Sequence, residues 1–133
     1  MPNEIPPIQK YMTHSPQTIS SAQTIQVAKQ MMNSLGVRHL PVVQDGKLMG
    51  VVSGRDIRLL EFWSGTDVHK SPVKEAVSPE PFCVSPNTPL NEVIRVMIEK
   101  NYGSAIISEG ERILGIFTVT DALRALLDRL EEK

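Results

Sequence analysis

Two short segments of the chain carry the same hydroxyl and carboxyl groups at the same spacing. Both follow the pattern glycine, two apolar residues, serine or threonine, two free positions and aspartate, with Ser53 and Asp56 in the first and Thr118 and Asp121 in the second. A hydroxyl at the start of a helix can meet a phosphate together with the unpaired N–H groups of the first turn. An aspartate three residues later can accept the hydroxyls of a ribose. The pattern therefore predicts two sites with the chemistry that a nucleotide needs.

The same residues also suit a purely structural role. Serine and threonine are preferred N-caps where a strand gives way to a helix, and an aspartate in the first turn stabilises the helix dipole. The glycines of the two segments, Gly50 and Gly115, allow either another backbone or a flat ring to approach closely. Their spacing alone leaves helix capping and ligand binding both open.

The two segments belong to a longer internal repeat. Residue 115 lies 65 positions after residue 50, and the same offset aligns further pairs without a gap: Pro16 with Pro81, Ile19 with Val84, Ser20 with Ser85, Ile25 with Leu90, Met32 with Met97 and Val42 with Ile107. A repeat of this length, present twice in 133 residues, indicates a duplicated α/β unit.

Each copy predicts the order strand, helix, strand, strand, helix, from the period of its apolar residues and from turn signals such as Asp45-Gly46. In the first copy we expect strands at 17–19, 37–43 and 47–52, a helix from 25 to Gly36 and a helix at 54–63. In the second we expect strands at 82–84, 104–107 and 112–117, a helix beginning near residue 90 and a helix at 121–130. The predicted fold class is α/β of the α+β type, built from two β-α-β-β-α repeats.

The repeat also predicts how the chain is divided. Residues 1–7 form a lead-in, residues 8–63 the first repeat, residues 64–75 a polar linker and residues 76–133 the second repeat. One small sheet has an apolar face that its two helices cannot cover. We therefore expect the two copies to pack about a pseudo-twofold axis and to form two equivalent clefts.

Composition narrows the class of protein. With 41% apolar and 22% charged residues, the chain has the composition of an ordinary soluble globular domain. Fourteen Lys and Arg against 15 Asp and Glu leave a net charge of -1, which gives no long-range attraction to nucleic acid or to an anionic membrane. No apolar stretch approaches the roughly 18 residues of a membrane span. The single cysteine, Cys83, excludes an intrachain disulfide and fits a cytoplasmic setting.

Neither a metal site nor a catalytic site is expected. The three histidines, His14, His39 and His69, have no metal-like spacing with one another or with Cys83. No nucleophile-elbow sequence and no evident general base accompanies Ser53. A small nucleotide-processing enzyme is therefore the least favoured function.

With this order of elements and both repeated segments in place, the chain resembles a tandem pair of cystathionine β-synthase (CBS) domains, or Bateman module. The resemblance covers residues 8–130 or so, and extends to Met12-Thr13, to residues 36–43 and to Val77-Ser78. It implies a non-catalytic module that binds AMP, ADP, ATP or S-adenosylmethionine in the clefts between paired domains. It also implies that the module regulates an enzyme, channel or transporter.

The resemblance further assigns roles to particular residues. The two aspartates would hold the ribose, the hydroxyls of the repeated segments would contact phosphate, and the opening strands would line the base pockets. Arg38 and His39, with Arg55 as a second candidate, would add phosphate contacts. The expected ligand residues are, in the first copy, Thr18, Ile19, Arg38, His39, Leu40, Pro41, Ser53, Arg55 and Asp56, and, in the second, Cys83, Val84, Gly103, Ser104, Ala105, Thr118 and Asp121.

The two clefts are expected to be unequal. The positions aligned with Arg38, His39 and Pro41 are Gly103, Ser104 and Ile106, so the second copy lacks the basic pair. Its small residues leave room for a ring but offer no charge to a triphosphate. The first cleft therefore suits a phosphate-rich ligand, whereas the second either takes an adenosine-like ligand of low charge or stays empty.

Members of this family commonly pair through the closing helices of the repeats. The resemblance therefore implies a homodimer with contacts at Leu59, Phe62, Ala125 and Leu126, next to Trp63. Packing of these residues within their own core is the alternative. A dimerisation module with vacant clefts is accordingly the main rival of the ligand-binding function.

Overall fold

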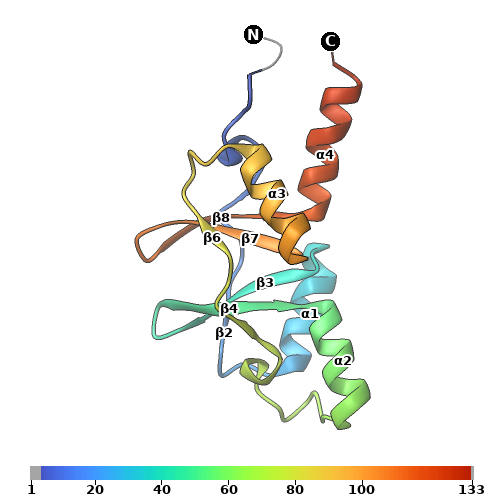
Figure 1. Ribbon diagram of the computed structural model, residues 1–133. Helices are drawn as coiled ribbons and strands as arrows, with labels where there is room; N and C mark the ends of the chain where they lie inside the picture. The colour runs from blue at the N-terminus through green and yellow to red at the C-terminus, as the bar shows by residue number, and fades with distance from the viewer. Residues whose placement is uncertain (1–3, 133) are drawn as a thin grey trace. The chain divides into compact units, whose positions relative to one another are not determined.

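Figure 1 shows a computed structural model of the protein, which describes residues 4–132. The chain forms two compact units of mixed α and β structure. We call residues 17–81 the central unit, and the residues up to Pro16 together with those from Phe82 onward the terminal unit. Each unit contains one four-stranded sheet, and both of its α-helices share one apolar core with one face of that sheet.

The central unit contains the five elements expected for the first copy, followed by a 3-10 helix and one further strand. Its elements are β2 (Ile19–Ser20), α1 (Ile25–Leu35), β3 (His39–Gln44), β4 (Lys47–Ser53), α2 (Gly54–Ser64), the 3-10 helix η2 (Val73–Ala76) and β5 (Ser78–Pro79). The strand order is β2-β3-β4-β5. The β2–β3 pair is parallel and the other two pairs are antiparallel.

The terminal unit repeats this plan. Its elements are the 3-10 helix η1 (Ile8–Lys10), β1 (Thr13–His14), β6 (Cys83–Val84), α3 (Leu90–Lys100), β7 (Ser104–Glu109), β8 (Arg112–Thr118) and α4 (Val119–Leu130). The strand order is β1-β8-β7-β6, with the β6–β7 pair parallel. The predicted order strand, helix, strand, strand, helix is confirmed in both copies.

Local sequence accounts for the ends of the regular elements. Thr24 accepts a hydrogen bond from the Val27 amide and so caps α1, and Gly36 ends the helix with a φ of 68°, a conformation that glycine adopts without steric cost. The turn between β3 and β4 uses Asp45 and Gly46 with φ values of 53° and 77°. Positive φ at both central residues is what a tight hairpin turn requires.

The sequence interpretation included no strand at β1 or β5, which we call the leading strands because they precede β2 and β6. Each has two residues, and β1 pairs with β8 whereas β5 pairs with β4. Residues 8–16, which the repeat groups with the first copy, therefore belong to the terminal unit. Packing explains this placement, because Ile8 and Met12 are buried in the same core as Val93 and Phe117.

The segment expected to be a linker is part of the central unit. Val73 is fully buried in the core of that unit. The Ile25 amide donates to the Ser71 carbonyl and the Gln26 amide donates to the Val68 carbonyl, both at 3.0 Å. These two N–H groups have no partner within α1, so the segment satisfies donors that a helix start leaves unpaired.

The segment before β1 likewise accepts a hydrogen bond from the first N–H group of α3. The Leu90 amide donates to the Pro6 carbonyl at 2.9 Å, and the Ile8 amide donates to the Thr88 carbonyl at 2.8 Å. Pro6 and Ile8 are aligned with Ser71 and Val73 by the 65-residue offset. The internal repeat therefore extends into the segments that precede β1 and β5.

The close approach of another backbone segment, and not of a flat ring, explains the two repeated glycines. Gly50 lies in the middle of β4, beside β5, and a Cβ there would clash with the Ser78 carbonyl oxygen and with the Val77 side chain. At Gly115 a Cβ would lie 2.9 Å from the Thr13 carbonyl oxygen and would also clash with Met12. Each glycine thus allows a leading strand to join its sheet.

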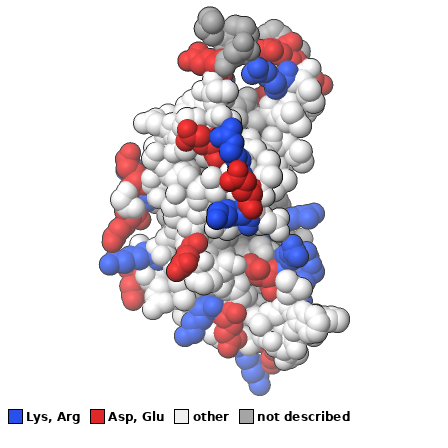
Figure 2. All heavy atoms as spheres, viewed as in Figure 1, with Lys and Arg blue, Asp and Glu red and all other residues white. Residues whose placement is uncertain are grey.

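The surface carries both signs of charge. On the face drawn in Figure 2, Lys and Arg lie among Asp and Glu in small groups, and the net charge of the chain is -1. None of the helices between residues 4 and 132 is long and apolar enough to cross a membrane.

Candidate functional site

In the central unit, polar candidate residues meet where β3 begins, β4 ends and α2 starts. His39 is the strand partner of Ser53 in the antiparallel β3–β4 pair. The Gly54 amide, at the start of α2, donates to the Arg38 carbonyl at 2.9 Å. The β3–β4 hairpin therefore brings Arg38, His39 and Ser53 to the same end of the sheet. This end lies beside the first turn of α2, which carries Asp56.

Ser53 and Asp56 form a capping box at the start of α2. Oγ of Ser53 accepts from the Asp56 amide at 3.0 Å, and Oδ2 of Asp56 accepts from the Ser53 amide at 3.3 Å. The Ser78 hydroxyl donates to the same Oδ2 at 3.3 Å. Oδ1 of Asp56 has no hydrogen bond to any residue in the described range, and the side chain is partly exposed. The cap uses one carboxylate oxygen and leaves the other available.

His39 is the titratable group whose environment is most informative. Burial lowers its pKa below the ordinary value of 6.5, the Asp56 carboxylate opposes this shift, and the Arg38 guanidinium adds to it. The imidazole is therefore neutral at pH 7, and Arg38, which is exposed, supplies the positive charge at this end of the sheet. Because the charges of Arg38 and Asp56 both affect the pKa of His39, both side chains lie near enough to interact electrostatically with the imidazole.

The apolar candidates of the central unit have a different environment. Ile19 and Leu40 are buried in the core between the sheet and its helices, and Pro41 is buried as well. Thr18 and Arg55 are exposed. The side chains of Ile19 and Leu40 thus stabilise the unit, and their contact with a ligand stays a prediction.

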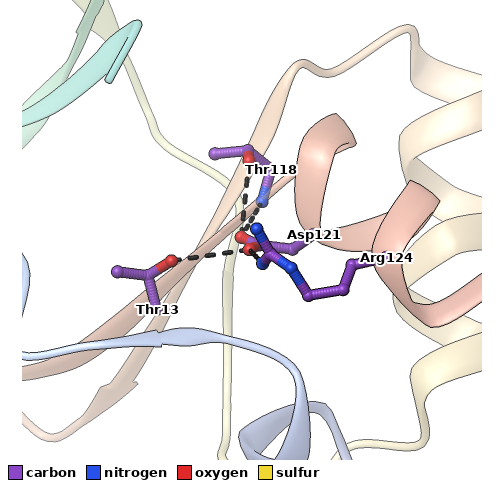
Figure 3. A network of polar contacts seen from close by, with 4 residues as sticks. All are labelled: Thr13, Thr118, Asp121 and Arg124. Atoms are coloured by element: carbon purple, nitrogen blue, oxygen red, sulfur yellow. Dashed lines mark hydrogen bonds and ion pairs between the residues drawn. The ribbon is translucent and has the colours of Figure 1, made fainter. Parts of the chain in front are cut away.

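In the terminal unit, Asp121 is the centre of a closed polar network (Figure 3). Its Oδ2 accepts from the Thr118 amide at 3.0 Å and from the Thr118 hydroxyl at 3.3 Å. Its Oδ1 accepts from the Thr13 hydroxyl at 3.5 Å and from the Arg124 guanidinium at 2.9 Å. Asp121 is only 3% exposed. Both of its oxygens are therefore engaged within the unit.

The remaining candidates of the terminal unit lie along β6 and β7. Ala105 belongs to the core of the unit and Val84 packs against it, whereas Cys83 and Gly103 are exposed and Ser104 is partly buried. Burial raises the pKa of the Cys83 thiol, and a hydrogen bond from Ser108 opposes the shift. None of these residues adds a positive charge, as the sequence predicts.

Sequence interpretation missed three residues that contact the two aspartates. Ser78 and Thr13 are the hydroxyl donors from β5 and β1, and Arg124 is the cation beside Asp121. The signals were present, because Thr13 and Ser78 are 65 positions apart and Arg124 follows Asp121 by three positions on a helix. The spatial proximity of β1 to α4, however, is not visible in the spacing.

A surface groove of about 610 Å³ lies elsewhere in the terminal unit. It is lined by the segment 4–11 and by one side of α3 and α4, and Leu90, Ile94, Ala125 and Leu126 contribute apolar surface. It contains none of the expected ligand residues. Among residues 4–132, no cluster of three or more His, Cys, Asp or Glu side chains could hold a metal ion.

Two hydroxyl–aspartate helix starts, each beside one small sheet, define a duplicated α+β module. Comparison with known families agrees with this fold. The family model described as "CBS domain" matches residues 8–60 and 73–128, and the chain belongs to the CBS domain family.

Curated relatives share this family. The chain is 33% identical over 110 residues to the CBS domain-containing protein YhcV of Bacillus subtilis, covering 83% of this chain and 78% of that protein. It is 28% identical over 133 residues to the uncharacterized protein MJ1225 of Methanocaldococcus jannaschii, covering 86% of this chain. The chain spans about half the length of the latter relative, 47%.

Solved structures support the fold. An uncharacterized conserved protein from Pyrococcus horikoshii has a TM-score of 0.83 and 31% identity, with 91% of this chain and 92% of that chain covered. The structure of the CBS domain pair of MJ0100 with 5′-methylthioadenosine and S-adenosyl-L-methionine has a TM-score of 0.86, 22% identity, and coverage of 95% and 99%. CBSX2 in complex with AMP has a TM-score of 0.77, 23% identity, and coverage of 92% and 97%.

Proposed function

We propose that the central unit binds an adenosine-type ligand and that the protein is a regulatory module responding to that ligand. The observation that carries the proposal is the carboxylate of Asp56, which caps α2 with one oxygen and keeps the other free beside Arg38 and His39. Asp56 offers an acceptor for a sugar hydroxyl, and Arg38 offers a positive charge for a phosphate. Both residues lie at the same end of one sheet.

Each polar residue has a role in this proposal. Asp56 accepts the ribose hydroxyls through Oδ1, and the exposed Arg38 contacts the phosphate. The Ser53 hydroxyl accepts from the Asp56 amide and can still donate its proton to a phosphate oxygen. Arg55, exposed on the first turn of α2, is the second candidate for a phosphate contact.

Structural neighbours support the ligand class rather than one compound. One CBS domain pair was solved with 5′-methylthioadenosine and S-adenosyl-L-methionine and another with AMP, and all three compounds contain adenosine. The basic side chain of Arg38 favours a phosphate-containing member of this class for the central unit. The regulated partner would respond to the ligand only through a difference in affinity between two states of the module.

A regulatory role fits the site better than a catalytic one. Activation of a serine nucleophile requires a general base within hydrogen-bond reach. Within residues 4–132, the hydrogen bond of the Ser53 hydroxyl oxygen is to the Asp56 amide, and no hydrogen bond joins this hydroxyl to a histidine or a lysine. We therefore propose that the bound ligand is sensed and not converted, which product analysis after incubation with ATP would check.

The test is ligand binding by the wild type and by an Asp56→Asn variant. The asparagine keeps an oxygen acceptor for the Ser53 amide, so the cap and the fold are retained while the charge is lost. We expect at least one of AMP, ADP, ATP, NADH and S-adenosylmethionine to raise the unfolding temperature, since a ligand at a hundredfold excess over Kd adds about 2.7 kcal/mol. In Asp56→Asn the affinity should fall about tenfold, because hydrogen bonds to a charged group contribute about 1.5–3 kcal/mol.

Glu75→Ala is the matched control. Glu75 is an exposed carboxylate of the same unit, so its loss changes the net charge equally without touching the site. Unchanged affinity in Asp56→Asn would remove Asp56 from the ligand contacts. No thermal shift with any of the five compounds would favour the ligand-free dimerisation module instead.

We also propose that a second copy of the chain is a partner. Phe62 and Trp63, at the end of α2, are 78% and 77% exposed and stack edge to face with their ring centres 5.1 Å apart. Two adjacent aromatic rings in solvent are more apolar surface than isolated exposed residues normally present. Leu59 and Leu126 are exposed too, whereas Ala125 packs within its own unit.

A further inference from the structure

The two aspartates differ in one partner. By the 65-residue offset, Thr118 corresponds to Ser53 and Thr13 corresponds to Ser78, and each of these residues contacts the aspartate of its own unit. The contacting atoms differ, because Ser78 donates to Oδ2 of Asp56 whereas Thr13 donates to Oδ1 of Asp121. The position that corresponds to Arg124, however, is Leu59. Asp121 therefore has a guanidinium at 2.9 Å, and Asp56 has a hydrocarbon side chain at the same place along its helix.

The position of Arg124 explains why it contacts Asp121. Residues three apart lie on one face of a helix, and Arg124 follows Asp121 by three positions on α4. Figure 3 shows the Arg124 side chain extending from α4 to the Asp121 carboxylate, with Thr13 on the other side of it. The bond is charge-assisted, which makes it roughly twice as strong as a bond between neutral groups.

A ribose would have to compete with this contact. Sugar hydroxyls are neutral donors, and the oxygen of Asp121 that is not occupied by Thr118 already accepts from Thr13 and Arg124. Asp121 is also almost completely buried, whereas Asp56 is partly exposed. A ligand can therefore reach Oδ1 of Asp56 without displacing a protein group, but it cannot do so at Asp121.

We propose that Arg124 acts as a built-in occupant of the Asp121 carboxylate, so that the chain binds one adenosine-type ligand through Asp56 and none through Asp121. Residue 124, and its counterpart residue 59, then decide which of the two repeats is open. The inference rests on the function proposed for Asp56 and adds the stoichiometry of binding. It makes Arg124 a positioning residue that contacts no ligand itself.

Isothermal titration calorimetry with AMP and, separately, with S-adenosylmethionine tests this proposal by measuring how many ligands each chain binds. The wild type should bind one ligand. Arg124→Leu, which installs the residue of the other repeat, should bind two, and the added site should disappear in Arg124→Leu combined with Asp121→Ala. Leu59→Arg should place a cation three residues after Asp56 and weaken the wild-type site about tenfold or more.

The variants are expected to fold, because the Arg124 side chain is 60% exposed and Leu59 is 44% exposed. Arg124→Gln, which removes the charge but keeps a polar side chain, serves as a second variant if Arg124→Leu does not fold. Two equal sites in the wild type, or one site in both the wild type and the Arg124 variants, would overturn the inference and leave the proposed function standing. No binding by any variant would overturn both.

Discussion

Single side chains in this protein combine a structural and a candidate binding role. Asp56 and Asp121 both hold a helix start and both accept a hydroxyl from a leading strand. The sequence predicted both aspartates and both hydroxyls but left capping and binding open. The structure shows capping in both units and reveals the difference that spacing alone did not, since Oδ1 of Asp121 has a charged partner and Oδ1 of Asp56 does not. The contact of Thr13 with Asp121 was not predicted, because it joins two residues 108 positions apart in the sequence.

His39 makes stability depend on pH. Burial lowers its pKa in the folded protein below 6.5, so the unfolded chain binds more protons below that pH, and stability is lost as pH falls through this window. We expect the free energy of unfolding in urea to decrease between about pH 7.5 and about pH 5.5. His39→Gln should show a smaller decrease.

Variants of the two exposed histidines, His14→Gln and His69→Gln, are the controls and should keep the wild-type pH dependence. An unaltered slope in His39→Gln would mean that the imidazole titrates normally in the folded chain.

At the scale of elements, long periodic segments were predictable and two-residue strands were not. The helix α1 begins at an apolar repeat and ends at Gly36, as its sequence indicates. The strands β1 and β5 are too short to show an alternating pattern, and their pairing with β8 and β4 depends on packing between distant segments. The repeated glycines were an indirect signal of these two strands, because β5 passes close to Gly50 and β1 passes close to Gly115.

The segments that precede β1 and β5 each pack in one unit. A core substitution in either segment should therefore destabilise the unit in which that segment packs. Ile8 and Val73 are equivalent by the 65-residue offset and both fully buried, but Ile8 packs in the terminal unit and Val73 in the central unit. Ile8→Ala should lower the free energy of unfolding by about 2–5 kcal/mol. Hydrogen exchange should then increase in α3 and β8, and in α1 and β3 for the matched Val73→Ala variant.

Faster exchange of α1 and β3 in Ile8→Ala, without a change in α3 and β8, would show that residues 8–16 pack with the first copy after all. The two variants thus test the division of the chain with the same measurement.

At the scale of the whole molecule, the exposed apolar surface is where the proposed self-association can be tested. Phe62 and Trp63 are the aromatic side chains most exposed among the described residues, and the apolar groove of the terminal unit includes Leu126. Replacing both aromatic residues with serine should lower the mass measured by light scattering from twice 14.8 kDa to 14.8 kDa. Burial of such rings typically dominates the energetics of an interface.

Ile98→Ser is the control for this substitution, because Ile98 is 75% exposed on α3 but lies outside the expected interface. A wild-type protein of 14.8 kDa in solution, or a dimer that persists in the Phe62→Ser, Trp63→Ser variant, would contradict the proposed contact.

The pairing of β1 with β8 also sets an order of assembly on the ribosome. Thr13 pairs with Ile116, which is translated 103 residues later, roughly 5–20 s at common elongation speeds. By contrast, the last strand of the central unit ends at Pro79, so that unit has all of its strands while the terminal one still lacks β6, α3, β7, β8 and α4. The strand β1 therefore remains without its partner until β8 has been translated.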